Sequence, residues 1–140
     1  MTASTSTLTP LDNPPSINAL EIHELLVTAY ATGNVAQKRC IDALRALQES
    51  KLYRQLGHRD IAGYADATLH LGRTQTFECL RVSRALVNLP LLAAAFERGE
   101  VSFSLVEKMT RVATVETQGA WLKYREGRPT HAVLALKDNN

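Results

Sequence analysis

The residues best suited to chemical recognition are four consecutive polar side chains that follow a short turn: Arg73, Thr74, Gln75 and Thr76. They open an apolar-periodic segment that predicts a helix from residue 74 to about 87, so they are expected at its exposed N-terminal end. Arginine and glutamine can form bidentate hydrogen bonds with base edges, and threonine can contact phosphates or a thymine methyl group. The pattern indicates contacts to double-stranded DNA.

Two further arginines, Arg81 and Arg84, lie on the same predicted helix and are expected to meet the DNA backbone. The whole chain has 140 residues, 16 of them basic and 14 acidic, a net charge of +2. Between residues 51 and 84, basic side chains outnumber acidic ones: Lys51, Arg54, Arg59, Arg73, Arg81 and Arg84 against Asp60, Asp66 and Glu78. The positive charge is therefore concentrated around the candidate contacts.

Residues that could perform catalysis or bind a metal are scattered. The histidines are His23, His58, His70 and His131. None has a partner at ligand spacing, and no Ser/His/Asp, Cys/His or paired-carboxylate arrangement stands out. The two cysteines, Cys40 and Cys79, fall in apolar segments, which predicts buried thiols. We expect no catalytic residue, no metal and no cofactor.

The overall composition is that of a folded globular chain, with 45% hydrophobic residues. The N-terminus lacks the basic region and apolar run of a signal peptide. The richest apolar stretch, residues 89–96, is far shorter than the roughly 20 residues that cross a bilayer. A soluble, cytoplasmic protein without membrane contact is expected.

A helix-turn-helix at about residues 60–87 must position the candidate contacts. Asp60 is the expected N-cap of a first helix, Ile61 to Leu69, whose core residues are Tyr64 and Leu69. The turn spans residues 70–73, where Leu71 is an apolar plug and Gly72 supplies backbone freedom. In the second helix, Phe77, Leu80 and Val82 are predicted to point inward, with Cys79 beside them.

The segments on the N-terminal side are predicted to support this motif. Residues 1–16 are rich in Ser, Thr and Pro, which indicates a flexible, disordered tail ending in a helix cap at Ser16. Helical periodicity then predicts one helix over 17–32, stopped by Gly33, and another over 34–49 capped by Asn34. Such a pair would form an antiparallel hairpin. The following Leu52, Tyr53 and Leu56 are expected to pack inward.

The segments on the C-terminal side predict further short helices. Pro90 starts one that Gly99 closes, and Ser102 or Ser104 caps the next. A last helix is expected from Thr114 to about residue 127, followed by a short helix or loose tail over 128–140. The prediction is an all-α bundle with one helical domain over residues 17–127.

The order of these motifs resembles the helical domain of unknown function that precedes the nuclease domain in many bacterial HNH endonuclease proteins. The matching residues are Leu52, Tyr53, Leu56, Gly57, Ile61, Tyr64, Leu69, Leu71, Arg73, the Leu89-Pro90 break and the turn Gly99–Ser102. The central part is also similar to the helix-turn-helix region of ParB-type partition proteins. Where the family has glycine and serine, this chain has His70 and Gly72, and Glu78 replaces a common basic residue. No HNH motif follows, so the resemblance implies the non-catalytic front half.

Three interpretations follow from these patterns. The first is a DNA-binding helix-turn-helix module. The second is a helical protein-protein interaction or dimerisation module without DNA binding, in which the apolar hairpin at residues 89–112 is either part of a homodimer interface or ordinary core. The third, an enzyme in its own right, has the least support, because capping and solvation explain Asp60, Asp66, His58 and His70 more simply.

Overall fold

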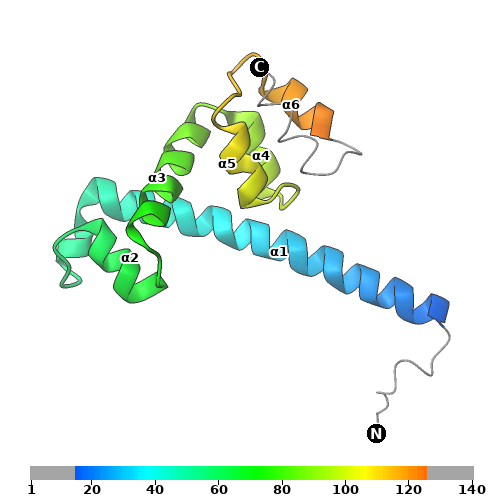
Figure 1. The fold of residues 1–140 in the computed structure, drawn as a ribbon, viewed down its shortest axis with the longest axis horizontal. Helices are drawn as coiled ribbons and strands as arrows, with labels where there is room; N and C mark the ends of the chain where they lie inside the picture. The colour runs from blue at the N-terminus through cyan, green and yellow to red at the C-terminus, as the bar shows by residue number, and fades with distance from the viewer. Residues whose placement is uncertain (1–14, 126–140) are drawn as a thin grey trace, which may run out of the picture.

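The computed structural model describes residues 15–125, and these form an all-α bundle without strands, as predicted. Figure 1 shows a long first helix that carries the shorter ones near its C-terminal end, with α2 on one side and α3 to α6 on the other. The elements are α1 (Pro15–Ser50), the 3-10 turn η2 (Leu52–Arg54), α2 (Ile61–Leu69), α3 (Arg73–Val87), α4 (Pro90–Glu97), α5 (Phe103–Met109) and α6 (Gln118–Arg125).

The predicted hairpin of two N-terminal helices is wrong, because α1 is one continuous helix of 36 residues. Gly33 lies inside it with a right-handed backbone, and a glycine in a helix costs only about 1 kcal/mol relative to alanine. Asn34 is not a cap. It is buried, and its Nδ2 donates to the carbonyl of Gly99 at 3.1 Å. Ser16 lies inside the helix and does not cap it.

The core lies where the C-terminal half of α1 meets α3, α4 and α5. Its most completely buried large side chains come from five helices: Ile41, Ile61, Leu80, Leu92, Phe96, Val106 and Met109. The hairpin at residues 89–112 contributes much of this core, so its apolar face is occupied within the chain. That arrangement leaves it little apolar surface for a subunit interface, with Leu91 the main exception.

The caps of α2 and α5 and the proline at the start of α4 were predicted correctly. The carboxylate of Asp60 accepts a hydrogen bond from the Gly63 N–H at 2.8 Å, and Ser102 Oγ accepts one from Leu105 at 3.3 Å. Pro90 is the first residue of α4. The backbone N–H groups of Leu91 and Leu92, in the first turn of α4, have no acceptor within the helix. Both donate instead to Oε1 of buried Gln118, which is distant in sequence.

Gly99 is required by a close approach between two helices. Its φ of +81° lies in the left-handed region, and an added Cβ would stand 2.6 Å from the carbonyl oxygen of Ala31 on α1. The turn after α4 therefore packs directly on the α1 backbone.

Several other predictions are wrong. Cys40, Leu52, Leu56, Leu69 and Phe77 are exposed to solvent although each was expected to be buried. The last helix begins at Gln118 rather than at Thr114. In the turn before it, the Thr114 and Thr117 hydroxyls accept hydrogen bonds from each other's backbone N–H.

Of the predicted tail at 1–16, residues 1–14 lie outside the described residues, as do residues 126–140, whereas Pro15 and Ser16 begin α1. Within residues 15–125, no single helix is long and apolar enough to cross a membrane.

Candidate nucleic-acid interface

The turn between α2 and α3 sets the direction of α3. His70 adopts a left-handed conformation with φ 58°, so it rather than Gly72 supplies the unusual backbone angle. The N–H of Leu71 then donates to the carbonyl of Ala65 at 3.3 Å, and the Leu71 side chain packs against the core. This plug holds the start of α3 against the end of α2.

The N-terminal end of α3 is open to solvent. Its N-cap is Gly72, which offers no side-chain acceptor to the first N–H groups of the helix. Arg73, Thr74 and Gln75 are all exposed there, and the Arg73 guanidinium lies 5.1 Å from the centroid of the Phe77 ring. Uncapped N–H groups at the positive end of a helix dipole form a favourable place for an anion such as phosphate.

Thr76 must be removed from the predicted contacts. Its side chain is completely buried, and its Oγ1 donates to the carbonyl of Gly72 at 2.9 Å. The sequence places it beside the exposed residues, but each residue advances about 100° around the helix, which turns the Thr76 side chain toward the core. The predicted contact set at this end is therefore reduced to Arg73, Thr74 and Gln75.

Arg81 lies on the solvent side of α3 within an ion-pair network. Its guanidinium donates to both oxygens of Glu78, at 3.1 and 2.8 Å, and to the carbonyl of Glu107 at 3.2 Å. Arg111, in the turn after α5, bridges the same two acids, at 2.6 Å to Glu78 and 2.8 Å to Glu107. Lys108 also pairs with Glu107 at 3.6 Å, so two carboxylates offset most of the charge of three cations and this part of α3 has little net positive charge.

The network also lowers the pKa of the Glu78 carboxyl group. Its pKa is lowered to about 2, first because Arg81 donates hydrogen bonds to the ionised form. The spacings of Glu78 to Arg81 and of Glu107 to Arg111 are those of helix ion pairs, a signal that could have revealed both pairs from the sequence. Arg84, the remaining predicted contact, is exposed further along α3.

A buried polar cluster joins α1 to α3. Ser83 Oγ donates to Asp42 at 2.8 Å and accepts from Arg45 Nε at 2.8 Å, and Lys38 pairs with the same aspartate. Although a serine, a carboxylate and a lysine meet here, Ser83 is completely buried, so no substrate can reach it. The sequence interpretation missed this cluster, because its members lie 38 and 41 residues apart.

The other reactive groups have structural surroundings. The ring of His58 stacks edge-on against Tyr64, with centroids 5.4 Å apart. Burial raises the pKa of the Cys79 thiol, which disfavours the nucleophilic thiolate. Among residues 15–125, no three histidine, cysteine or acidic side chains are grouped to hold a metal ion.

Comparison of the chain with protein-family models, with curated proteins and with solved structures gave no match. The site must therefore be interpreted from its own geometry.

Proposed function

We propose that this chain is a DNA-binding helix-turn-helix module that inserts the N-terminal end of α3 into the major groove of duplex DNA. The observation that carries the proposal is the uncapped start of a 15-residue helix with Arg73, Thr74 and Gln75 all exposed. In helix-turn-helix proteins, the N-terminal residues of the second helix contact the base edges.

Each group at this end has a distinct role in the proposed complex. Arg73 and Gln75 bind base edges, because guanidinium and amide groups can form paired hydrogen bonds there. Thr74 and the free N–H groups of the first turn bind phosphate oxygens. Arg84 contacts the DNA backbone further along the helix. By its resemblance to the front half of HNH endonuclease proteins, the chain supplies binding and no cleavage.

The test is selection of bound sequences from a pool of random duplexes, followed by binding titrations with the purified full chain at several salt concentrations. Arg73→Ala or Gln75→Ala should weaken binding to the selected site by about 1–3 kcal/mol. Because both side chains are exposed, the melting temperature should hardly change. Arg84→Ala should weaken binding to all duplexes and reduce the salt slope by about one.

The control is Arg98→Ala, which removes an exposed arginine, paired with Glu100, at the end of α4 and far from the start of α3 along the chain. This variant should bind the selected site as the wild type does. Absence of binding to any duplex at low salt would refute the proposal.

A protein-interaction module without DNA binding is the second candidate function. The observation in its favour is the exposed apolar surface on the first half of α1, where Leu20, Leu25 and Leu26 are each about two-thirds exposed. An oligomer that binds no duplex would support this alternative.

A further inference from the structure

The first half of α1 is an apolar helix with no packing partner among the described residues. Figure 1 shows it extending well beyond the other helices. Six large apolar side chains in this half are more than half exposed: Leu20, Ile22, Leu25, Leu26, Val27 and Tyr30. Isolated helices of this length are marginal in water, and most helical stability in proteins comes from packing an apolar face. The surface therefore requires a partner.

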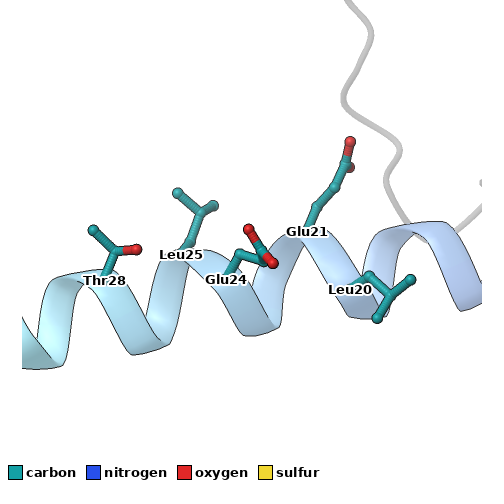
Figure 2. A pocket seen from close by; sticks show the side chains of 5 residues that line it. All are labelled: Leu20, Glu21, Glu24, Leu25 and Thr28. Atoms are coloured by element: carbon teal, nitrogen blue, oxygen red, sulfur yellow. The ribbon is translucent and has the colours of Figure 1, made fainter.

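A small-molecule ligand does not fit this surface. An open hollow along this half of α1 is lined, among the described residues, by Leu20, Glu21, Glu24, Leu25 and Thr28. Figure 2 shows these side chains spread along the outside of a single helix. A ligand there would stay in solvent on most sides, whereas small-molecule sites bury most of their ligand.

One set of apolar and small residues of α1, which includes Ile22 and Leu26, follows a heptad spacing that continues onto its second half. We define the α1 seam as the exposed residues that recur alternately at four and three positions: Ile22, Leu26, Ala29, Gly33, Ala36, Cys40 and Ala43. The core-facing residues Asn34 and Ile41 lie on a different side of the helix. A sustained spacing of this kind is typical of helices that pair side by side.

We propose that two copies of this chain pair through the α1 seam. Their first helices run antiparallel, and the two-fold axis crosses them at the level of residue 31. In this register, large side chains meet small ones: Leu26 faces Ala36, Ile22 faces Cys40, and Ala29 faces Gly33 of the second copy. The helices overlap over about 25 residues, roughly 37 Å at 1.5 Å per residue. The unsupported half of each α1 thus packs on the supported half of the other.

Charge complementarity favours the antiparallel orientation over the parallel one. The first half of α1 carries Glu21 and Glu24, whereas the exposed cation of the second half is Arg39. The antiparallel register brings Glu21 of one copy to the same edge of the helix pair as Arg39 of the other, within about one helical turn. A parallel pair would instead align the acidic first halves of the two helices at the same level and bring no cation to them.

A groove in the domain extends the surface that would receive the second copy. It is apolar, has a volume of about 120 Å³, and is lined by Cys40, Ala43, Leu44, Leu47, Tyr64 and Leu69. Cys40 and Ala43 belong to the seam, and Leu47 continues its spacing four positions later. The groove therefore lies at the end of the seam. In the antiparallel register it faces the first turns of the second copy's α1. Seam and groove together form one continuous apolar surface.

The mass of the full chain in solution tests the proposal. Light scattering over a wide concentration range should give a dimer of twice 15.4 kDa. Leu26→Glu should raise the dimer dissociation constant by about a hundredfold or more, because it places a carboxylate in the seam. Leu56→Glu, at an equally exposed leucine outside the seam, should leave the dimer intact. A monomeric wild type, or a dimeric Leu26→Glu variant, would overturn the proposal.

Cross-linking and charge reversal test the register. Under oxidising conditions, Ile22→Cys should give a covalent dimer through native Cys40, and adding Cys40→Ser should abolish it. A Cys40–Cys40 cross-link in the wild type would indicate parallel helices and refute the antiparallel register. Arg39→Glu should weaken the dimer, and Glu21→Arg in the same chain should restore it. Failure of the second change to restore the dimer would refute the Glu21–Arg39 contact.

Discussion

The carboxylate of Glu78 lies between two guanidinium groups, with Oε2 at 2.8 Å from Arg81 and 2.6 Å from Arg111. On α3 it neutralises positive charge that the sequence would assign to a DNA contact. The same carboxylate also links α3 to Arg111, in the turn after α5. A single acidic residue thus limits the candidate interface to the end of the helix.

The first prediction concerns the pH dependence of this network. The folded-state pKa of Glu78 is lowered from 4.5 to about 2, so its stabilisation is complete above pH 4.5 and is lost as the pH falls toward 2. Glu78→Gln should cost about 1 kcal/mol at neutral pH, a modest value because the network lies at the surface. The difference in unfolding free energy between wild type and variant should shrink in acid. Urea titrations at several pH values measure it, and a constant difference would contradict the assignment.

The second prediction concerns the glycines. Gly99→Ala should destabilise the fold by at least about 2 kcal/mol, because it combines a positive φ with a backbone clash. Gly33→Ala is the matched control, since nothing lies within 4 Å of its added Cβ. It should stabilise the helix by up to about 1 kcal/mol. Both glycine variants are compared by thermal unfolding in a Leu26→Glu background, so that association of the chain does not affect the result. Equal changes in stability for the two variants would refute the close approach of Gly99 to Ala31.

At the scale of elements, the predictability of each helix depended on how local its signals are. The bounds of α2 and the starts of α4 and α5 follow from Asp60, Pro90 and Ser102, which act within one turn. The continuity of α1 through Gly33 could not be predicted, because a glycine can stop a helix or lie within one. Which side of α3 faces the core also depends on distant contacts. For that reason the burial of Thr76 was missed.

The third prediction tests the open end of α3 as a phosphate-binding element. Gly72 has φ −69° and nothing within 4 Å of an added Cβ, so a side chain fits there. Gly72→Asp should cap the helix and stabilise it by a few tenths of a kcal/mol. The same carboxylate would occupy the free N–H groups and repel phosphate, so DNA binding should weaken although stability rises. Gly72→Ser, which caps the helix without adding a charge, should weaken DNA binding less. Equal DNA binding by the wild type and the two variants would contradict a role of this helix end in binding phosphate.

At the scale of the whole molecule, the sequence predicts the all-α class, because helical periodicity persists along the chain. The sequence does not predict which apolar faces pack within the chain and which remain exposed. The hairpin at residues 89–112 looks as suitable for an interface as α1 does, yet its Leu92, Phe96 and Val106 are used in the core. The exposed apolar surface lies instead on the segment predicted to pair within the chain. Only the three-dimensional arrangement separates a face used internally from one left for a partner.

The last prediction follows from that distribution of contacts. If α1 packs against a second copy, the helicity of its first half depends on association, whereas its second half is supported by the core. Hydrogen exchange should therefore show residues 20–30 protected in the wild type and unprotected in Leu26→Glu. Residues 38–48 should remain protected in both proteins, which serves as the internal control. Equal protection of residues 20–30 in the two proteins would mean that α1 is stable without a second copy, and the coupling between dimerisation and folding of α1 would be refuted.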